Sequence, residues 1–234
     1  MRRVFMEQLT AIFKDLFIPH TVGLEGFILA GQQTLWMVVV SLVLGVILGG
    51  LLGIILVLTR PNGIRPHRAI YNVLNPIINI VRSLPFIILL VAVMPITRLI
   101  LDVGIGTSAA MIPLTIYIAP FIARLVETSL LEVDHGIIEA ANAMGASTFE
   151  TVWHFLIPEA KASLILNFTT ATIGLIGATA MAGAIGAGGI GDLAINYGYN
   201  RYDNAVIVYC VIILVVLVQA IQMIGNYFAK RVRS

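Results

Sequence analysis

Long apolar runs dominate the chain and divide it into five candidate membrane spans. A helix needs about 20 apolar residues to cross the hydrocarbon core of a bilayer. The clearest run is 35–58, which contains no charged residue. The other four runs are 77–97, 103–123, 162–191 and 204–229. The pattern predicts an all-α, polytopic membrane helix bundle with five transmembrane helices. Because 162–191 is too long for one straight crossing, we expect a bend, a re-entrant turn or a loop inside it.

The segment 1–33 precedes the first span and differs from a cleavable signal, because Glu7 interrupts its apolar run and no small-residue cleavage site follows. Apolar residues recur in it at helical spacing until Pro19; they are Phe5, Leu9, Ile12, Phe13, Leu16 and Phe17. This spacing is typical of an amphipathic helix on the bilayer surface. A helix that binds a partner protein is the alternative.

Composition excludes several other classes of protein. The chain has 234 residues, of which 59% are apolar and 11% charged, whereas a soluble domain is about 45–50% apolar and about 25% charged. A net charge of +2 is too small for a nucleic-acid binder. One cysteine and four scattered histidines give no metal-ligand spacing, so we expect no metal and no cofactor in this chain.

Lysines and arginines near the span ends set the expected orientation. The 59–76 loop, the 124–161 loop and the C-terminal tail share one side; their basic residues are Arg60, Arg65, Arg68, Arg124, Lys161, Lys230, Arg231 and Arg233. The other side has Arg98 and Arg201. The first side is therefore expected to be cytoplasmic, with the N-terminus outside and the C-terminus in the cytoplasm.

The 124–161 loop between the third and fourth spans is predicted to form two helices separated by a turn. Asp134 can cap the first helix, and Gly145 stands where a left-handed residue ends it. Ser147 and Glu150 have the spacing of a capping box at the start of the second. The apolar surface of such an element, outside the bilayer, needs a partner.

This loop resembles the signature of the membrane subunits of bacterial ABC importers: E-A-A, three residues, G, nine residues, I, one residue and L-P. The matching residues here are Glu139, Ala140, Ala141, Gly145, Phe155, Ile157 and Pro158, with Phe155 and Ile157 as apolar replacements. The resemblance implies a coupling helix that docks on an ATP-binding subunit. From the residues alone, Glu139 is either a solvated charge at a helix start or the contact of a basic partner residue.

Three further stretches resemble the membrane subunits of D/L-methionine importers. With them the resemblance covers 34–231, the expected transmembrane domain. They are Ile80–Leu90, Ala119–Arg124 and Gly186–Gly191. The resemblance implies a bacterial inner-membrane homodimer that transports D/L-methionine or another small solute. It also implies two ATP-binding subunits, which hold ATP and Mg, and an extracytoplasmic substrate-binding lipoprotein.

The chain itself has no phosphate-binding motif, because the run Gly186–Gly191 is not followed by Lys-Ser or Lys-Thr. It is therefore expected not to be an enzyme. An ion-coupled secondary carrier is the alternative within transport, but such carriers usually show internal repeats and intramembrane acids. An intramembrane enzyme is the rival from a different class and would need paired acidic residues or a Ser/His pair inside the spans.

Four residues are candidates for the substrate pathway: Arg82, Ser83, Thr179 and Met181. Arg82 either orients a substrate carboxylate or extends its charge to the cytoplasmic interface. A stripe of small residues in the fourth span suggests close helix contact; it consists of Gly174, Ala178, Ala182 and Gly186. Met181 either forms a movable apolar constriction there or fills a packing gap. Five helices cannot readily enclose an aqueous path, so two copies are expected to face each other.

Overall fold

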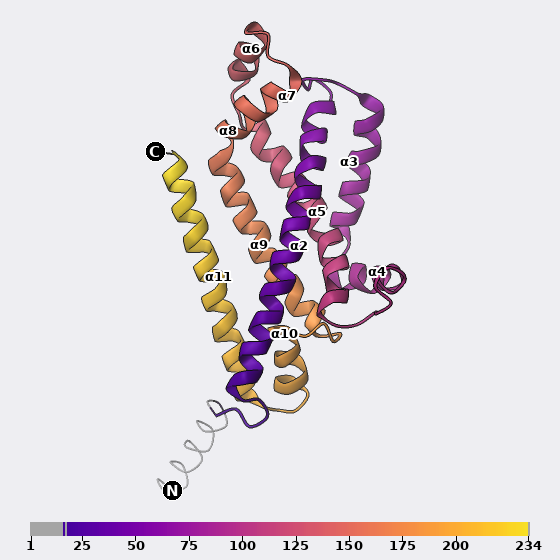
Figure 1. Ribbon diagram of the computed structural model, residues 1–234, viewed down its shortest axis with the longest axis vertical. Coiled ribbons are helices and arrows are strands. Elements are labelled where there is room, and N and C mark those ends of the chain that lie inside the picture. The colour runs from indigo at the N-terminus through magenta and orange to yellow at the C-terminus, as the bar shows by residue number, and fades with distance from the viewer. Residues whose placement is uncertain (1–15, 17, 234) are drawn as a thin grey trace, which may run out of the picture.

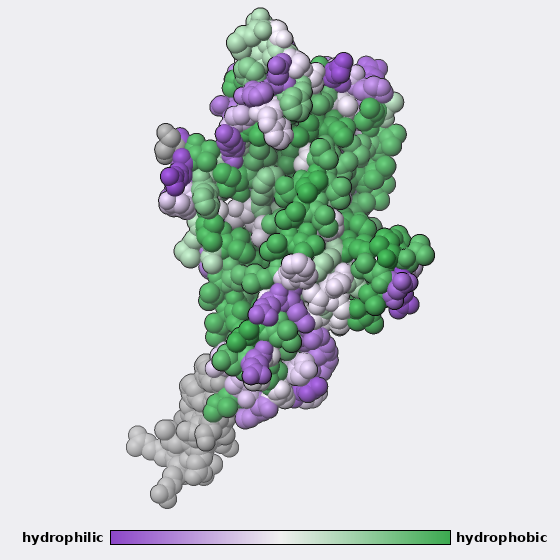
Figure 2. Space-filling model, in the orientation of Figure 1, coloured by the Kyte–Doolittle hydropathy of each residue, from purple (hydrophilic) through white to green (hydrophobic). Residues whose placement is uncertain are grey.

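The computed structural model describes residue 16 and residues 18–233, and this part of the chain is helical without strands (Figure 1). The predicted amphipathic helix that ends before Pro19 lies outside the described residues, apart from Leu16 and Ile18. On the face drawn in Figure 2, hydrophobic residues form a broad band across the middle of the molecule, and hydrophilic residues gather toward its two ends and at one projection on the side. This distribution is that of a bundle that crosses a membrane.

Four helices are long and apolar enough to cross a bilayer: α2 (Leu24–Thr59), α5 (Thr107–Leu131), α9 (Lys161–Gly183) and α11 (Asn204–Arg233). Within the described residues, a fifth crossing can come only from α3 (Arg68–Ser83) together with α4 (Phe86–Leu101), which are bent by 111° (Figure 1). Leu84 is extended at this bend, with a ψ of 129°, because Pro85 disfavours the helical conformation in the residue before it. The predicted span 77–97 therefore includes a sharp bend.

The long charge-free stretch 162–191 contains one helix and a turn. Helix α9 ends at Gly183, and the chain continues in α10 (Ile190–Asp192) and the π-helical segment η2 (Leu193–Tyr199). The intervening glycine run is tied to α2, since the side chains of Gln33 and Thr34 accept hydrogen bonds of 2.8 and 2.9 Å from the amides of Gly189 and Ile190. The glycine run thus forms a loop that is held against α2 by these two hydrogen bonds. Gly189 has a φ of +84° in this loop, a conformation that favours glycine.

Helices α2 and α5 form the centre of the bundle because glycines allow their backbones to approach closely. A Cβ atom on Gly49 would lie 2.4 Å from the carbonyl oxygen of Ala119, and one on Gly53 would lie 2.6 Å from that of Ala123. Gly45 continues this row one turn earlier, against Ile118. Small residues at every fourth position are the usual means of close helix association in membranes.

We expect Gly49→Ala to destabilise the chain by at least about 1–3 kcal/mol, the usual cost of overpacking, because its methyl group would overlap a backbone oxygen. Gly50→Ala is the matched control, since a Cβ atom on Gly50 would meet no atom of the described residues within 4 Å. Thermal unfolding of the purified variants in detergent measures the difference. Equal melting temperatures for both variants would show that α2 and α5 can separate without cost.

The carboxylate of Asp203 joins the segment before α2 to the start of α11. Its Oδ2 accepts hydrogen bonds from the amides of His20 and Thr21 and from the Thr21 hydroxyl, at 2.7 to 2.9 Å. Its Oδ1 accepts the amide of Val206 in the first turn of α11. Burial by itself raises the pKa of this carboxyl, but the four hydrogen bonds outweigh that effect and hold the pKa below its usual range.

Replacing Asp203 by Asn is expected to lower the stability of the chain by about 1.5–3 kcal/mol, the usual worth of hydrogen bonds to a charged group. Because the pKa of Asp203 is lower in the folded state, its contribution is present above the unfolded pKa of about 3.9 and is lost as the pH falls through the folded value. The difference in melting temperature between the two chains should therefore narrow as the pH falls from neutral toward about pH 3. A constant difference would contradict the role of the charge.

Candidate functional site

The loop between α5 and α9 forms a compact element at one end of the bundle. Its first helix is α6 (His135–Ala143), which Figure 1 shows farthest from the membrane-spanning helices. The Asp134 side chain accepts a 2.7 Å hydrogen bond from the amide of Gly136 and so caps this helix, as the sequence predicted. Glu139 lies exposed on α6 and faces His135 at 3.6 Å, one turn earlier.

The turn after α6 has the geometry expected of Gly145. Its φ is +75°, and its amide donates to the carbonyl of Asn142 at 3.0 Å. The amide of Ala146 donates to the carbonyl of Ala141, also at 3.0 Å, which completes a Schellman motif. The polypeptide therefore reverses at a position where residues with a side chain are strained.

The second helix begins with the predicted capping box. Ser147 donates its amide to the carboxylate of Glu150 at 2.8 Å, and Glu150 donates its amide to the Ser147 hydroxyl at 3.3 Å. The hydrogen bond from the Ser147 amide lowers the pKa of the Glu150 carboxyl most, and the hydrogen bond from the Ser147 hydroxyl lowers it further. The helix comprises α7 (Thr148–Glu150), the π-helical η1 (Thr151–Leu156) and α8 (Ile157–Glu159). The π-helical turns precede Pro158, whose nitrogen cannot donate a hydrogen bond.

The residues of the E-A-A signature take different places in this element. Glu139 and Ala140 are exposed on α6, whereas Ala141 is fully buried on the opposite face of the same helix. Gly145 and Phe155 line one shallow cavity of about 380 Å³, together with Met144 and His154 among others. The last two residues of the signature, Ile157 and Pro158, are half-buried in α8 at the junction with α9. The accessible residues of the signature thus lie on α6 and beside this cavity.

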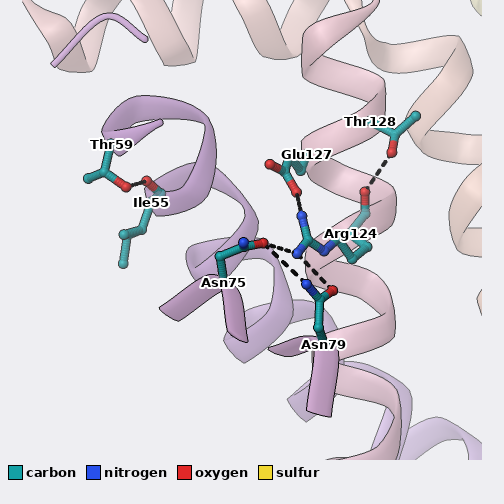
Figure 3. Close-up of polar contacts among 7 residues, drawn as sticks. All are labelled: Ile55, Thr59, Asn75, Asn79, Arg124, Glu127 and Thr128. Carbon is teal, nitrogen blue, oxygen red and sulfur yellow. Dashed lines mark hydrogen bonds and ion pairs between the residues drawn. The ribbon is translucent and has the colours of Figure 1, made fainter. Parts of the chain in front are cut away.

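A polar network joins α3 to α5 (Figure 3). The guanidinium of Arg124 contacts the carboxylate of Glu127 and donates to the side-chain oxygens of Asn75 and Asn79, the latter at 2.9 Å. Only 6% of Glu127 is exposed. Residue-by-residue interpretation of the sequence missed this network. The signals were the helical spacing of the two asparagines and the spacing of three residues between the two charges.

The structure also changes the boundary of the loop predicted over 124–161. Helix α5 continues to Leu131, so that Arg124 and Glu127 lie on a long helix and the loop begins at Glu132. The two charges are tolerated there because they pair with each other and with α3. They also add two charged residues to a spanning helix, besides Arg82 on α3.

Arg82 and Ser83 end the polar face of α3 at the bend. Arg82 is exposed, and its guanidinium carbon lies 5.8 Å from the ring centre of Phe121. The Ser83 hydroxyl donates to the carbonyl of Asn79 at 2.7 Å. Asn72, Asn75 and Asn79 precede them on the same face at helical spacing. The side chains of α3 therefore form a polar stripe toward the bend between α3 and α4.

Beyond this bend, Met181 lines an apolar cavity of about 530 Å³ with Ile87, Gly177, Ala180, Ala184 and Ile195. Met181 is 51% exposed and lies on the same face of α9 as Gly174, Gly177 and Ala184. Thr179 lies elsewhere, because it is buried and donates to the carbonyl of Ile176. Ala178 and Ala182 are also buried inside the bundle, so the predicted stripe of small residues packs mostly within the chain.

These features describe a membrane-transport subunit, and comparison with known families agrees. Residues 41–234 match the family described as "Binding-protein-dependent transport system inner membrane component". The chain belongs to this family. The predicted resemblance and the all-α membrane fold are thereby confirmed, and the chain is a transport component rather than an enzyme.

Individual relatives of the chain bear the names of methionine permeases. A "Probable D-methionine transport system permease protein MetI" of Vibrio cholerae is 44% identical over 203 residues, which are 87% of this chain and 90% of the relative. A "Methionine import system permease protein MetP" of Bacillus subtilis is 41% identical over 172 residues, 74% of this chain and 78% of the relative.

Solved structures give the same result. A structure of inward-facing conformations of the MetNI methionine ABC transporter superposes with a TM-score of 0.86 at 43% identity, over 88% of this chain and 96% of that one. An amino acid ABC transporter solved with histidines shares the fold, with a TM-score of 0.72 at 19% identity over 88% and 93% of the two chains.

Proposed function

We propose that the chain forms the translocation pathway of an ATP-driven importer for methionine. The observation that carries this proposal is the coupling element 134–158, whose exposed α6 helix is held in place by a Schellman turn and a capping box. Relatives at 41–46% identity bear methionine permease names. An ATP-binding subunit, which holds ATP and Mg, docks on α6 and on the cavity beside Gly145.

Two copies of the chain make up the pathway. The face of α9 that carries Met181 otherwise exposes small residues, Gly174, Gly177 and Ala184, which favour close contact between membrane helices. One chain leaves the cavity beside Met181 open on this face. A second copy closes it, and the pair presents two coupling elements to two ATP-binding subunits.

The coupling element and the C-terminus face the cytoplasm, and the N-terminal end of α2 faces outward. In Figure 1 the α6–α8 element, the α2–α3 loop and the C-terminus share one end of the bundle, and most basic residues near span ends lie in these segments. An excess of Lys and Arg marks cytoplasmic loops. An extracytoplasmic substrate-binding lipoprotein delivers methionine at the opposite end.

Substrate passes along the polar stripe of α3 and the apolar cavity beyond the bend. Arg82 attracts the substrate carboxylate, and Met181 from each copy closes the apolar part. We expect Arg82→Gln to reduce ATP-driven uptake at least about tenfold, because loss of one charged contact costs roughly 1.5–3 kcal/mol. Arg98→Gln, at the far end of α4, is the control. Unchanged uptake by the Arg82 variant would remove it from the pathway.

The function is tested with proteoliposomes that contain this chain, its ATP-binding subunit and the binding protein. Labelled methionine should accumulate only with ATP and Mg, and the chain alone should hydrolyse no ATP. Uptake driven by an ion gradient without ATP would support the secondary carrier instead. ATP-driven uptake of another small solute, with none of methionine, would retain the importer and overturn the substrate.

A further inference from the structure

An apolar groove lies between α2 and the second helix of the coupling element, on a surface that the transport pathway does not use. Its volume is about 700 Å³. Leu51, Ile54 and Leu58 of α2 form one wall, and Phe149, Val152 and Trp153 form the other. Arg65, from the α2–α3 loop, is the single charged side chain among the described residues that line it. We propose that this groove binds an anionic phospholipid from the bilayer leaflet next to the coupling element.

The wall formed by α2 belongs to the surface of that helix that faces lipid. Leu51 is exposed and continues a row of large exposed side chains on α2: Leu44, Ile47, Leu48 and Ile55. Large aliphatic residues are typical of lipid contact, whereas helix–helix interfaces in membranes favour small residues. The glycines that bring α2 close to another helix, Gly45, Gly49 and Gly53, lie instead at its contact with α5. A lipid therefore fits this wall better than a second copy of the chain.

The depth of the groove matches one leaflet of the bilayer. No charged residue occurs in α2 between Gly26 and Thr59, and Arg60 follows at its end. At 1.5 Å per residue, the stretch from Leu51 to Thr59 extends about 12 Å from that end into the apolar layer. The groove thus spans most of the apolar part of one leaflet, which is about 15 Å deep, and Arg65 lies near the boundary with water.

The opposite wall has the aromatic side chains that favour this boundary. Phe149 and Trp153 are 70% and 56% exposed, and their rings stack with centres 6.0 Å apart and planes inclined by 7°. Tryptophan is enriched where membranes meet water. The acidic neighbour Glu150 lines a different cavity, beside Gly145, and is held by Ser147. Glu150 is not among the described residues that line the groove, although Ser147 is, so Arg65 supplies the charge that selects an anionic headgroup.

The two tryptophans of the chain permit a direct test. In a Trp36→Phe background, Trp153 is the single fluorophore of its type. The chain is reconstituted in two sets of vesicles with the same mixture of phosphatidylcholine and phosphatidylglycerol. In one set a fixed mole fraction of brominated acyl chains is carried by phosphatidylcholine, and in the other the same fraction is carried by phosphatidylglycerol. Brominated chains quench a tryptophan that they contact. We expect brominated phosphatidylglycerol to quench Trp153 with about fivefold selectivity, the value for one basic residue near a membrane surface.

Arg65→Gln should remove the selectivity and retain quenching by both lipids. Arg60→Gln is the matched control, because Arg60 lies in the same loop but lines a separate cavity against α6. Equal quenching by the two lipids with Arg65 intact, or quenching by neither, overturns the proposal. If quenching disappears when the ATP-binding subunit is added, the groove belongs to that subunit and the proposal is overturned. If quenching decreases as the number of chains per vesicle is raised, the groove belongs to a second copy of the chain. Neither ATP nor substrate is used, so the result is independent of the proposed function.

Discussion

Replacing Arg124 by Met should destabilise the chain by about 3–5 kcal/mol, the usual cost of removing one partner of a buried ion pair. Glu127 would keep its charge at a position that is 6% exposed. It would also lose the guanidinium that contacts it from one turn away (Figure 3). Asn75 and Asn79 would lose a shared donor at the same time, so the contact between α3 and α5 would weaken. Unfolding of the purified chain in detergent, by heat or denaturant, measures this loss.

A double variant separates the buried charge from the loss of packing. Arg124→Met combined with Glu127→Gln removes both charges, and we expect it to recover most of the stability, since replacing a whole pair is far less costly than breaking it. Thr128→Val, on the exposed neighbouring position where the hydroxyl only bonds the Arg124 carbonyl, should have little effect. If the single and double variants unfold alike, the ion pair contributes through its shape and not through its charge.

Local signals in the sequence were sufficient to predict the coupling element. The caps are formed by hydrogen bonds between residues two or three positions apart, which involve Asp134, Ser147 and Glu150. Sequence spacing alone is therefore enough to predict them. Gly145 likewise stands at the end of its own helix. The assignment of long apolar runs to helices depended on equally local information, namely length and hydropathy.

Contacts between helices were not predictable in this way. Arg124 was assigned to a loop because its charge ended an apolar run, whereas α5 continues past it by pairing it with Glu127 and with α3. Gly49 was one of several glycines in the first span, and only the structure shows that it faces α5 while Gly50 faces none of the described residues. The stripe in α9 predicted close helix contact but not its partner, and the structure shows that Ala178 and Ala182 pack inside the same chain.

Replacing Gly145 by Val should abolish ATP-driven uptake while the chain still inserts in the membrane. Gly145 has a φ of +75°, and a Cβ there would meet no atom of the described chain within 4 Å, so the cost comes from the backbone and not from a clash. A residue with a side chain pays about 1–2 kcal/mol in this conformation, and a β-branched one more. The turn would relax, and α6 would change its direction relative to the helix that begins at Ser147. The apolar surfaces on the two sides of the turn would then no longer fit one partner.

Gly145→Asn is the control, because asparagine adopts the left-handed conformation more readily than other residues with a side chain. It should retain uptake, and Val should not, although both remove the glycine. Co-purification of the ATP-binding subunit with each variant shows whether docking is lost, and uptake of labelled methionine in proteoliposomes shows whether coupling is lost. The melting temperature of the chain should change little, since α2, α5, α9 and α11 are untouched. Normal uptake by the Val variant would mean that the orientation of α6 does not matter for coupling, and the docking surface proposed around Glu139 would lose its physical basis.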